Sequence, residues 1–93
     1  MKIYFKHSTQ CPISARAKRE VDHFLKEKPG DIEFELIDVL SNRTRSNEIA
    51  RQLGVQHESP QVIITDSANK VLWSASHRGI TEESIRQALR DSR

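Results

Sequence analysis

The stretch Lys2–Ser14 reads KIYFKHSTQCPIS, and it joins a short strand to the start of a helix. β-Branched and aromatic residues occupy the centre of Lys2–Lys6, which predicts a strand. Proline is favoured at the first position of a helix because its missing N–H would be unpaired there anyway. Pro12 therefore predicts a helix start, with Cys11 as the N-cap residue.

Cys11 is the only cysteine in the chain. At a helix start, unpaired amide N–H groups and the positive end of the helix dipole favour a thiolate. We therefore expect the pKa of this thiol to lie below the value of about 8.5 for a free cysteine. A free cysteine can also be a small buried hydrophobe, but such a residue normally lies within an apolar stripe, and Cys11 precedes it. Cys11 is the predicted catalytic thiol, and Pro12 fixes its place at the helix start.

Ser14 stands three residues after Cys11, where dithiol oxidoreductases carry a second, resolving cysteine. Serine cannot resolve a disulfide. Any redox cycle at Cys11 must therefore pass through a mixed disulfide that an external thiol breaks. Two interpretations of Ser14 are open: a local hydrogen bond in the first helical turn, or a hydroxyl that supports the thiolate.

The rest of the chain alternates between strand and helix patterns. Three helices and four strands are predicted: a helix from Pro12 to Leu25 ended by Pro29-Gly30, a buried strand Asp31–Val39, a helix Arg43–Leu53 capped by Gly54, a hairpin of Gln61–Thr65 and Lys70–Ser74, and a last helix with Thr81 as N-cap. We expect one α/β domain over residues 1–93, with a four-stranded mixed sheet in the order βαβαββα and helices covering it.

Composition excludes several classes of protein. No apolar run approaches the roughly 20 residues of a membrane span. The net charge of +2 comes from 15 basic and 13 acidic residues spread along the chain, which argues against nucleic acid as a partner. The histidine spacings match no zinc pattern, so no metal site is predicted. Without a secretory signal or a pair of cysteines, we expect a cytoplasmic protein. We also expect it to act as a monomer.

Three ordered blocks of sequence resemble one known family. KHSTQCPISA (6–15), SNEIARQLGVQHESPQV (46–62) and LWSASHRGIT (72–81) are similar to the monothiol bacilliredoxins of the bacillithiol system, which carry a Cys-Pro-Ile-Ser motif. The predicted element order is also that of a minimal thioredoxin or glutaredoxin fold. The resemblance runs along most of the chain, and the middle block is its most specific part.

The resemblance implies a thiol-disulfide oxidoreductase that removes bacillithiol from protein mixed disulfides. Cys11 would take up bacillithiol from S-thiolated client proteins, and free bacillithiol, the co-substrate, would regenerate it; no tightly bound cofactor is implied. Pro60 matches the proline that thioredoxin-like proteins hold in cis opposite the active cysteine, leaving the backbone of Ser59 free to pair with a substrate. The alternative for Pro60 is an ordinary strand-opening proline.

Several basic side chains are candidates around this chemistry. His7 is a candidate for supporting the thiolate. His57 and His77, together with Lys6 and Arg78, are candidates for meeting the carboxylates of the malyl group of bacillithiol. Any of the histidines can equally be an ordinary surface residue. Trp73 is expected in the core.

Other functions remain open from the sequence. A glutathione-type monothiol glutaredoxin would use the same single-cysteine logic with another carrier thiol. A non-catalytic thioredoxin-like binding module, or a carrier sharing an iron–sulfur cluster between two chains, are alternatives outside redox catalysis. Preference for bacillithiol depends on the HESPQ (57–61) and SASH (74–77) segments.

Overall fold

The computed structural model describes residues 1–10, 12–28 and 30–92. The elements follow in the order β1 (Lys2–His7), α1 (Pro12–Leu25), β2 (Glu33–Asp38), α2 (Arg43–Leu53), β3 (Gln61–Thr65), β4 (Val71–Ser76), the 3₁₀ turn η1 (His77–Gly79) and α3 (Glu82–Asp91). This is the predicted α/β order, with η1 as an addition.

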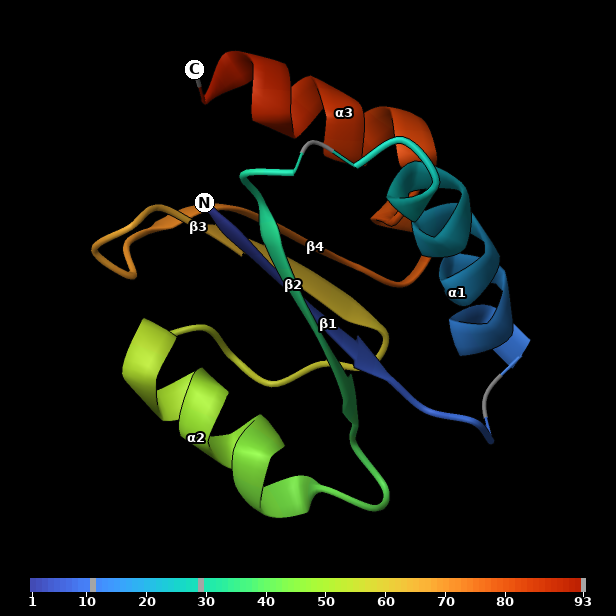
Figure 1. Ribbon diagram of the computed structural model, residues 1–93. Coiled ribbons are helices and arrows are strands. Elements are labelled where there is room, and N and C mark those ends of the chain that lie inside the picture. The colour runs from blue at the N-terminus through green and yellow to red at the C-terminus, as the bar shows by residue number, and fades with distance from the viewer. Residues whose placement is uncertain (11, 29, 93) are drawn as a thin grey trace.

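The four strands form one mixed sheet in the order β2-β1-β3-β4. β1 pairs parallel with β2 and antiparallel with β3, and β3 pairs antiparallel with β4. Figure 1 shows α1 and α3 together on one side of this sheet and α2 alone on the other. Because β1 and β2 are parallel, their carboxyl ends, at His7 and Asp38, lie at the same edge.

Each face of the sheet has its own hydrophobic core. The larger core joins the α1 and α3 side to alternate residues of β1 and β3, and includes Phe5, Phe24, Ile64 and Ile85. The smaller core lies under α2 and consists of Tyr4, Ile37, Ile49 and Ile63. Side chains of a strand alternate between faces, so β1 contributes to both cores.

Helix ends follow the capping signals of the sequence. Gly54 closes α2 with a φ of +66°, in the left-handed region that favours glycine. Thr81 is the N-cap of α3 and accepts a hydrogen bond from the backbone N–H of Ser84, whose hydroxyl in turn accepts from the N–H of Thr81. The first turn of α3 is further tied to α1, since the Glu82 N–H donates to the Glu20 carboxylate at 2.9 Å.

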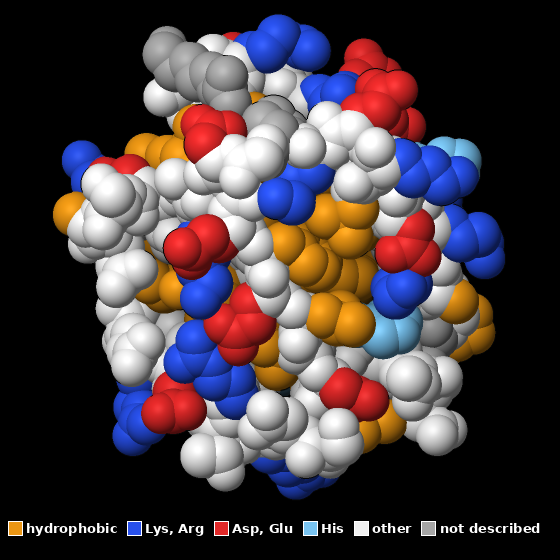
Figure 2. Space-filling view, in the orientation of Figure 1, with side chains coloured by type: hydrophobic (Ala, Val, Ile, Leu, Met, Phe, Trp, Pro, Cys, Tyr) orange, Lys and Arg blue, Asp and Glu red, His pale blue; other side chains and the backbone are white. Residues whose placement is uncertain are grey.

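The prediction of a buried second strand was wrong. Among the described strands, β2 lies at the edge of the sheet and pairs with β1 alone, and the side chain of Leu36 is exposed. Figure 2 shows hydrophobic side chains reaching the surface near the middle of this face, where Figure 1 places the space between β2 and α1. The fully buried strand is β3, an inner strand all five residues of which are buried.

Smaller differences concern element ends. α1 ends at Leu25, the last residue of its predicted apolar stripe and ahead of the Pro29-Gly30 pair expected to end it, and a turn in which Glu27 N–H donates to the Phe24 carbonyl follows. The last strand runs two residues beyond the predicted Ser74, because Ser76 still pairs with Gln61. Trp73 is partly buried and packs against the larger core, as expected. In the described ranges 1–10, 12–28 and 30–92, no helix is long and apolar enough to cross a bilayer.

Candidate active site at the carboxyl end of β1

The last two residues of β1 are basic, and their side chains point to opposite faces of the sheet. Lys6 points to the α2 side, where its Nζ lies 3.2 Å from Nδ1 of His57. His7 points to the α1 side, where its ring centroid lies 5.6 Å from that of Phe5, a residue of the larger core. The chain then leads directly into the residues around Cys11.

The segment ahead of Cys11 is held by a short chain of hydrogen bonds. Ser14 is fully buried, and its Oγ accepts a bond from the backbone N–H of Ser8 at 3.1 Å. The hydroxyl of Ser8 accepts in turn from the N–H of Gln10 at 3.3 Å. The local hydrogen-bonding interpretation of Ser14 is therefore confirmed. The predicted helix start at Pro12 is also confirmed, whereas the predicted N-cap, Cys11, lies outside the described residues.

His7 is half-buried beside α1. Burial lowers the pKa of its imidazole, and the nearby positive charge of Lys18 lowers it further, while Asp38 and Asp22 oppose these effects. The ring is accordingly neutral near pH 7. Its Nδ1 is buried and has no hydrogen-bond partner within the described part of the chain.

Lys6, Ser46 and His57 form a cluster on the α2 side. Lys6 is fully buried, and burial lowers the pKa of its ammonium group. The Oγ of Ser46, on α2, also lies 3.2 Å from Nδ1 of His57. Burial lowers the pKa of His57, and the charge of Lys6 adds to this, against the opposing effect of Glu58. The polar cluster sits at the end of the smaller apolar core.

The bond between Ser59 and Pro60 is cis, as the sequence resemblance led us to expect. Pro60 is buried immediately before β3, and its carbonyl accepts a hydrogen bond from the backbone N–H of His77 at 3.1 Å. The Oγ of Ser59 is buried without a partner among the described residues. This loop therefore offers a polar atom that nothing in the described protein engages.

The candidate binding residues divide into two groups. His57 and Lys6 meet beneath α2. His77 and Arg78 belong to η1, which packs against α1 and is exposed. The cis-proline segment connects the two, since it follows His57 in the chain and its Pro60 carbonyl is bonded to His77. The structure does not gather all four side chains into one pocket.

A pocket of about 340 Å³ opens beside the Lys6 cluster. It is lined by Val39, Leu40, Arg43, Ser46, Asn47 and His57. Val39 adjoins the candidate active segment, the residues that run from His7 towards Cys11, because its backbone N–H donates to the carbonyl of His7 at 3.0 Å. The sequence did not single out Arg43, Ser46 or Asn47. Ser46 did leave a signal, since it lies three residues before Ile49 on the buried stripe of α2.

The described residues contain no group of three or more histidine, cysteine or acidic side chains placed to hold a metal ion. The start of α1, the cis-proline and several basic side chains all lie at the end of the sheet where β1 finishes. This combination, in this topology, defines a thiol-disulfide oxidoreductase with a thioredoxin fold.

Comparisons with known proteins agree with this class. A solved protein described as an oxidoreductase with a thioredoxin fold is 33% identical, with a TM-score of 0.81 over 95% of this chain and 76% of that protein. Thioredoxin 1 from Thermosipho africanus TCF52B is 20% identical, with a TM-score of 0.74 over 99% and 93% of the two chains. Thioredoxin from Trypanosoma brucei brucei is 22% identical, with a TM-score of 0.72 over 98% and 73%. The last two show the fold alone.

The family follows from a match over most of the chain. The model of the monothiol bacilliredoxin BrxC family matches residues 1–85. The chain therefore belongs to the monothiol bacilliredoxin family, as the three sequence blocks predicted.

Proposed function

We propose that this protein removes bacillithiol from S-thiolated client proteins in the cytoplasm, with Cys11 as the nucleophile. The observation that carries the proposal is Ser14. The place of a resolving cysteine is taken by a fully buried hydroxyl that the Ser8 N–H engages, in a chain with a single cysteine. The mixed disulfide on Cys11 must then be resolved by an external thiol, which is bacillithiol in this family.

The proposed cycle exchanges disulfides without net oxidation. The Cys11 thiolate attacks the bacillithiol sulfur, a new S–S bond forms, and the client sulfur leaves as a thiolate that takes up a proton. A second bacillithiol thiolate then attacks the bacillithiol sulfur of the Cys11 adduct. Bacillithiol disulfide forms, and the Cys11 thiolate is released for another round.

The surrounding residues support this cycle in different ways. Pro12 starts the helix whose amide N–H groups favour a thiolate at the preceding residue. His7 contributes a neutral imidazole whose buried Nδ1 has no hydrogen-bond partner among the described residues, and Ser59 contributes a buried hydroxyl beside Pro60 that has none there either. His77 and Arg78 present basic groups on η1 to an anionic client or thiol. We propose that Ser59 and Pro60 form the surface along which the client segment lies.

The test is de-thiolation of one client protein that carries either bacillithiol or glutathione in a mixed disulfide. We expect the wild-type protein with free bacillithiol to release the client thiol, and Cys11→Ser to be inactive. Equal or faster turnover of the glutathione adduct would assign the chain to glutathione instead. Client binding by Cys11→Ser with no wild-type turnover of either adduct would favour a binding module.

The number of bacillithiol molecules attached to the chain provides a second measurement. After oxidation with excess bacillithiol, mass spectrometry should show one bacillithiol on Cys11. A visible chromophore in the anaerobically purified protein would instead indicate an iron–sulfur carrier.

A further inference from the structure

Burial of the Lys6 ammonium group costs desolvation free energy. It is fully buried on the α2 side of β1, next to the apolar cluster that includes Tyr4 and Ile37. Its only hydrogen-bond contact among the described residues is the imidazole of His57, which carries no compensating negative charge. A buried ammonium group normally needs an anionic partner, because desolvation disfavours its charged form. Within the part of the chain that the structure describes, Lys6 therefore has no anionic partner.

The side chains around the 340 Å³ pocket have more hydrogen-bond donors than acceptors. Lys6 has three N–H donors and no acceptor, yet it shares Nδ1 of His57 with the hydroxyl of Ser46. Arg43 and Asn47 add further N–H groups to the lining. Arg43 is also the first residue of α2, where the backbone of the helix is electropositive. An acceptor-only, negatively charged ligand would satisfy this set.

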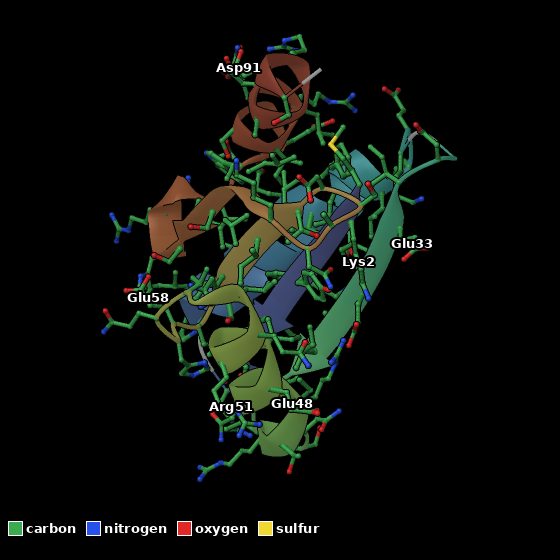
Figure 3. The ribbon with its side chains drawn as sticks, turned by 90° about the vertical axis from the view of Figure 1, so that its left-hand side faces the viewer. Lys2, Glu33, Glu48, Arg51, Glu58 and Asp91 are labelled. Carbon is green, nitrogen blue, oxygen red and sulfur yellow. The ribbon has the colours of Figure 1, made fainter. Side chains whose placement is uncertain are left out.

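The acidic side chains near this pocket, Asp38 and Glu58, do not pair with its basic groups among the described residues. The Oδ1 of Asp38 accepts hydrogen bonds from the backbone N–H groups of Leu40 and Ser41 at 2.9 and 3.3 Å. Glu58 is close enough to His57 to oppose the lowering of its pKa. Figure 3 shows Glu58 extending outward from the loop ahead of β3, away from the sheet. Neither carboxylate forms an ion pair with Lys6 or Arg43 among the described residues.

We propose that this pocket binds the carboxylate end of the small thiol that passes through Cys11, with Arg43, Ser46, Asn47 and His57 at its wall and the buried Lys6 beneath. The volume of about 340 Å³ lies at the small end of the range for small-molecule sites, which suits a short dicarboxylic acid. The pocket adjoins the active segment through the Val39–His7 hydrogen bond. The inference rests on the proposed function and assigns to its carrier thiol a subsite in which Arg43, Ser46 and Asn47 take part.

Malate, a free dicarboxylate, is the direct probe of this pocket. In the Cys11→Ser protein, titration with malate should shift the NMR signals of Ser46, Asn47 and the His57 ring in a saturable way. Arg43→Gln should weaken malate binding roughly tenfold, the effect of losing one charge-assisted hydrogen bond. Lys6→Met should also weaken it, because the substitution removes the buried positive charge beneath the pocket wall. The matched control is Arg51→Gln, an exposed arginine in the last turn of α2 that does not line the pocket. It should bind malate as well as the parent.

The Lys6→Met variant distinguishes a loss of malate binding from a loss of folding. Because the substitution removes a buried cation, the urea midpoint of unfolding should rise while malate binding falls. A loss of binding caused by misfolding would instead lower the midpoint. If Lys6→Met retains full malate affinity, or if Arg51→Gln loses as much affinity as Arg43→Gln, the pocket assignment is wrong.

Turnover distinguishes the carrier's carboxylates from general anion binding. Arg43→Gln should raise KM for a client that carries bacillithiol and leave KM unchanged for the same client carrying β-mercaptoethanol, which has no carboxylate. Inorganic phosphate at equal ionic strength should not displace malate, and displacement would identify a general anion patch. Absence of malate binding would overturn the pocket alone, because de-bacillithiolation by wild type is measured separately.

Discussion

At the scale of single residues, Ser14 shows how a position that has no thiol can still shape the active segment. Its side chain is fully buried within the first turn of α1, and it accepts the backbone N–H of Ser8. The residues between His7 and Pro12 must leave a strand and enter a helix within four positions. One hydrogen bond from the helix back to this connection fixes where the chain turns. Ser14 is thus a positioning residue as well as the replacement for a resolver.

Ser14→Ala should destabilise the fold by about 1–3 kcal/mol, because the buried N–H of Ser8 loses its acceptor. Urea unfolding followed by circular dichroism measures the change. Ser67→Ala, in the exposed turn after β3, is the control and should alter stability by less than about 0.5 kcal/mol. Equal stability of Ser14→Ala and wild type would show that water replaces the hydroxyl.

At the scale of elements, α2 is the helix whose limits the sequence defines best. Its predicted and observed bounds are both Arg43–Leu53, because its apolar residues repeat at helical spacing and Gly54 stops it. Asn42 begins it, accepting a hydrogen bond from the N–H of Arg45 at 3.3 Å. The helix carries Arg43, Ser46 and Asn47 to the pocket in its first turns, so its ends also determine the pocket's position.

Gly54→Ala should lower the free energy of unfolding by about 1 kcal/mol, since an alanine at a φ of +66° meets backbone strain although no atom lies within 4 Å of its Cβ. Gly30→Ala is a matched control with equally open space and no positive φ, and it should be neutral or slightly stabilising. Thermal unfolding of the two variants side by side checks the prediction. A loss of equal size in both would assign the effect to something other than the helix end.

The sequence predicted the elements well and their environment less well. Periodicity and capping residues are local, so the bounds of α2 and β3 were predicted correctly. Whether a strand lies at the edge depends on which strands pair, and an apolar run such as that of β2 does not reveal it. Leu36 is exposed for this reason. Strand burial is a property of the assembled sheet.

The site shows the same division between local and distant information. The roles expected of Pro12 and Ser14 concern neighbours within one turn, and the helix start and hydrogen bond of that turn were confirmed. Lys6 and His57 are separated by 51 positions, and their contact arises only when β1 and the loop ahead of β3 meet beside α2. For the same reason, nothing in the sequence indicated that His77 and Arg78 would lie apart from this pair.

At the scale of the whole molecule, one carboxylate connects three elements on the α2 side. Glu35 of β2 accepts hydrogen bonds from the guanidinium of Arg45, on α2, at 2.7 and 2.8 Å. Lys2 of β1 lies 3.0 Å from the same carboxylate. Arg45, together with Lys2, lowers the pKa of Glu35 to about 2 from its ordinary value of 4.5. Figure 3 shows Lys2 beside β2, close to the open edge of the sheet.

The stability that Glu35 provides should depend on pH. Because its folded-state pKa is depressed, the contribution is fully present above pH 4.5 and is lost as the pH falls towards 2. Glu35→Gln should therefore cost about 1 kcal/mol near neutral pH, and the difference from wild type should shrink at pH 3. Urea unfolding at both pH values measures it. Glu83→Gln, an exposed residue of α3, should show no such dependence, and a constant cost in Glu35→Gln would exclude the ion pair as the cause.

The alternation of Lys6 and His7 on β1 makes the two halves of the site separately adjustable. Lys6 faces α2 and His7 faces α1, so a substitution on the α2 side of the sheet leaves the residues on the α1 side in place. Under the proposed pocket assignment, substitutions at Arg43, Ser46 and Asn47 would change recognition of the carrier thiol and leave the segment around Cys11 unchanged. The peptide bond between Lys6 and His7, at the carboxyl end of β1, separates the two sides.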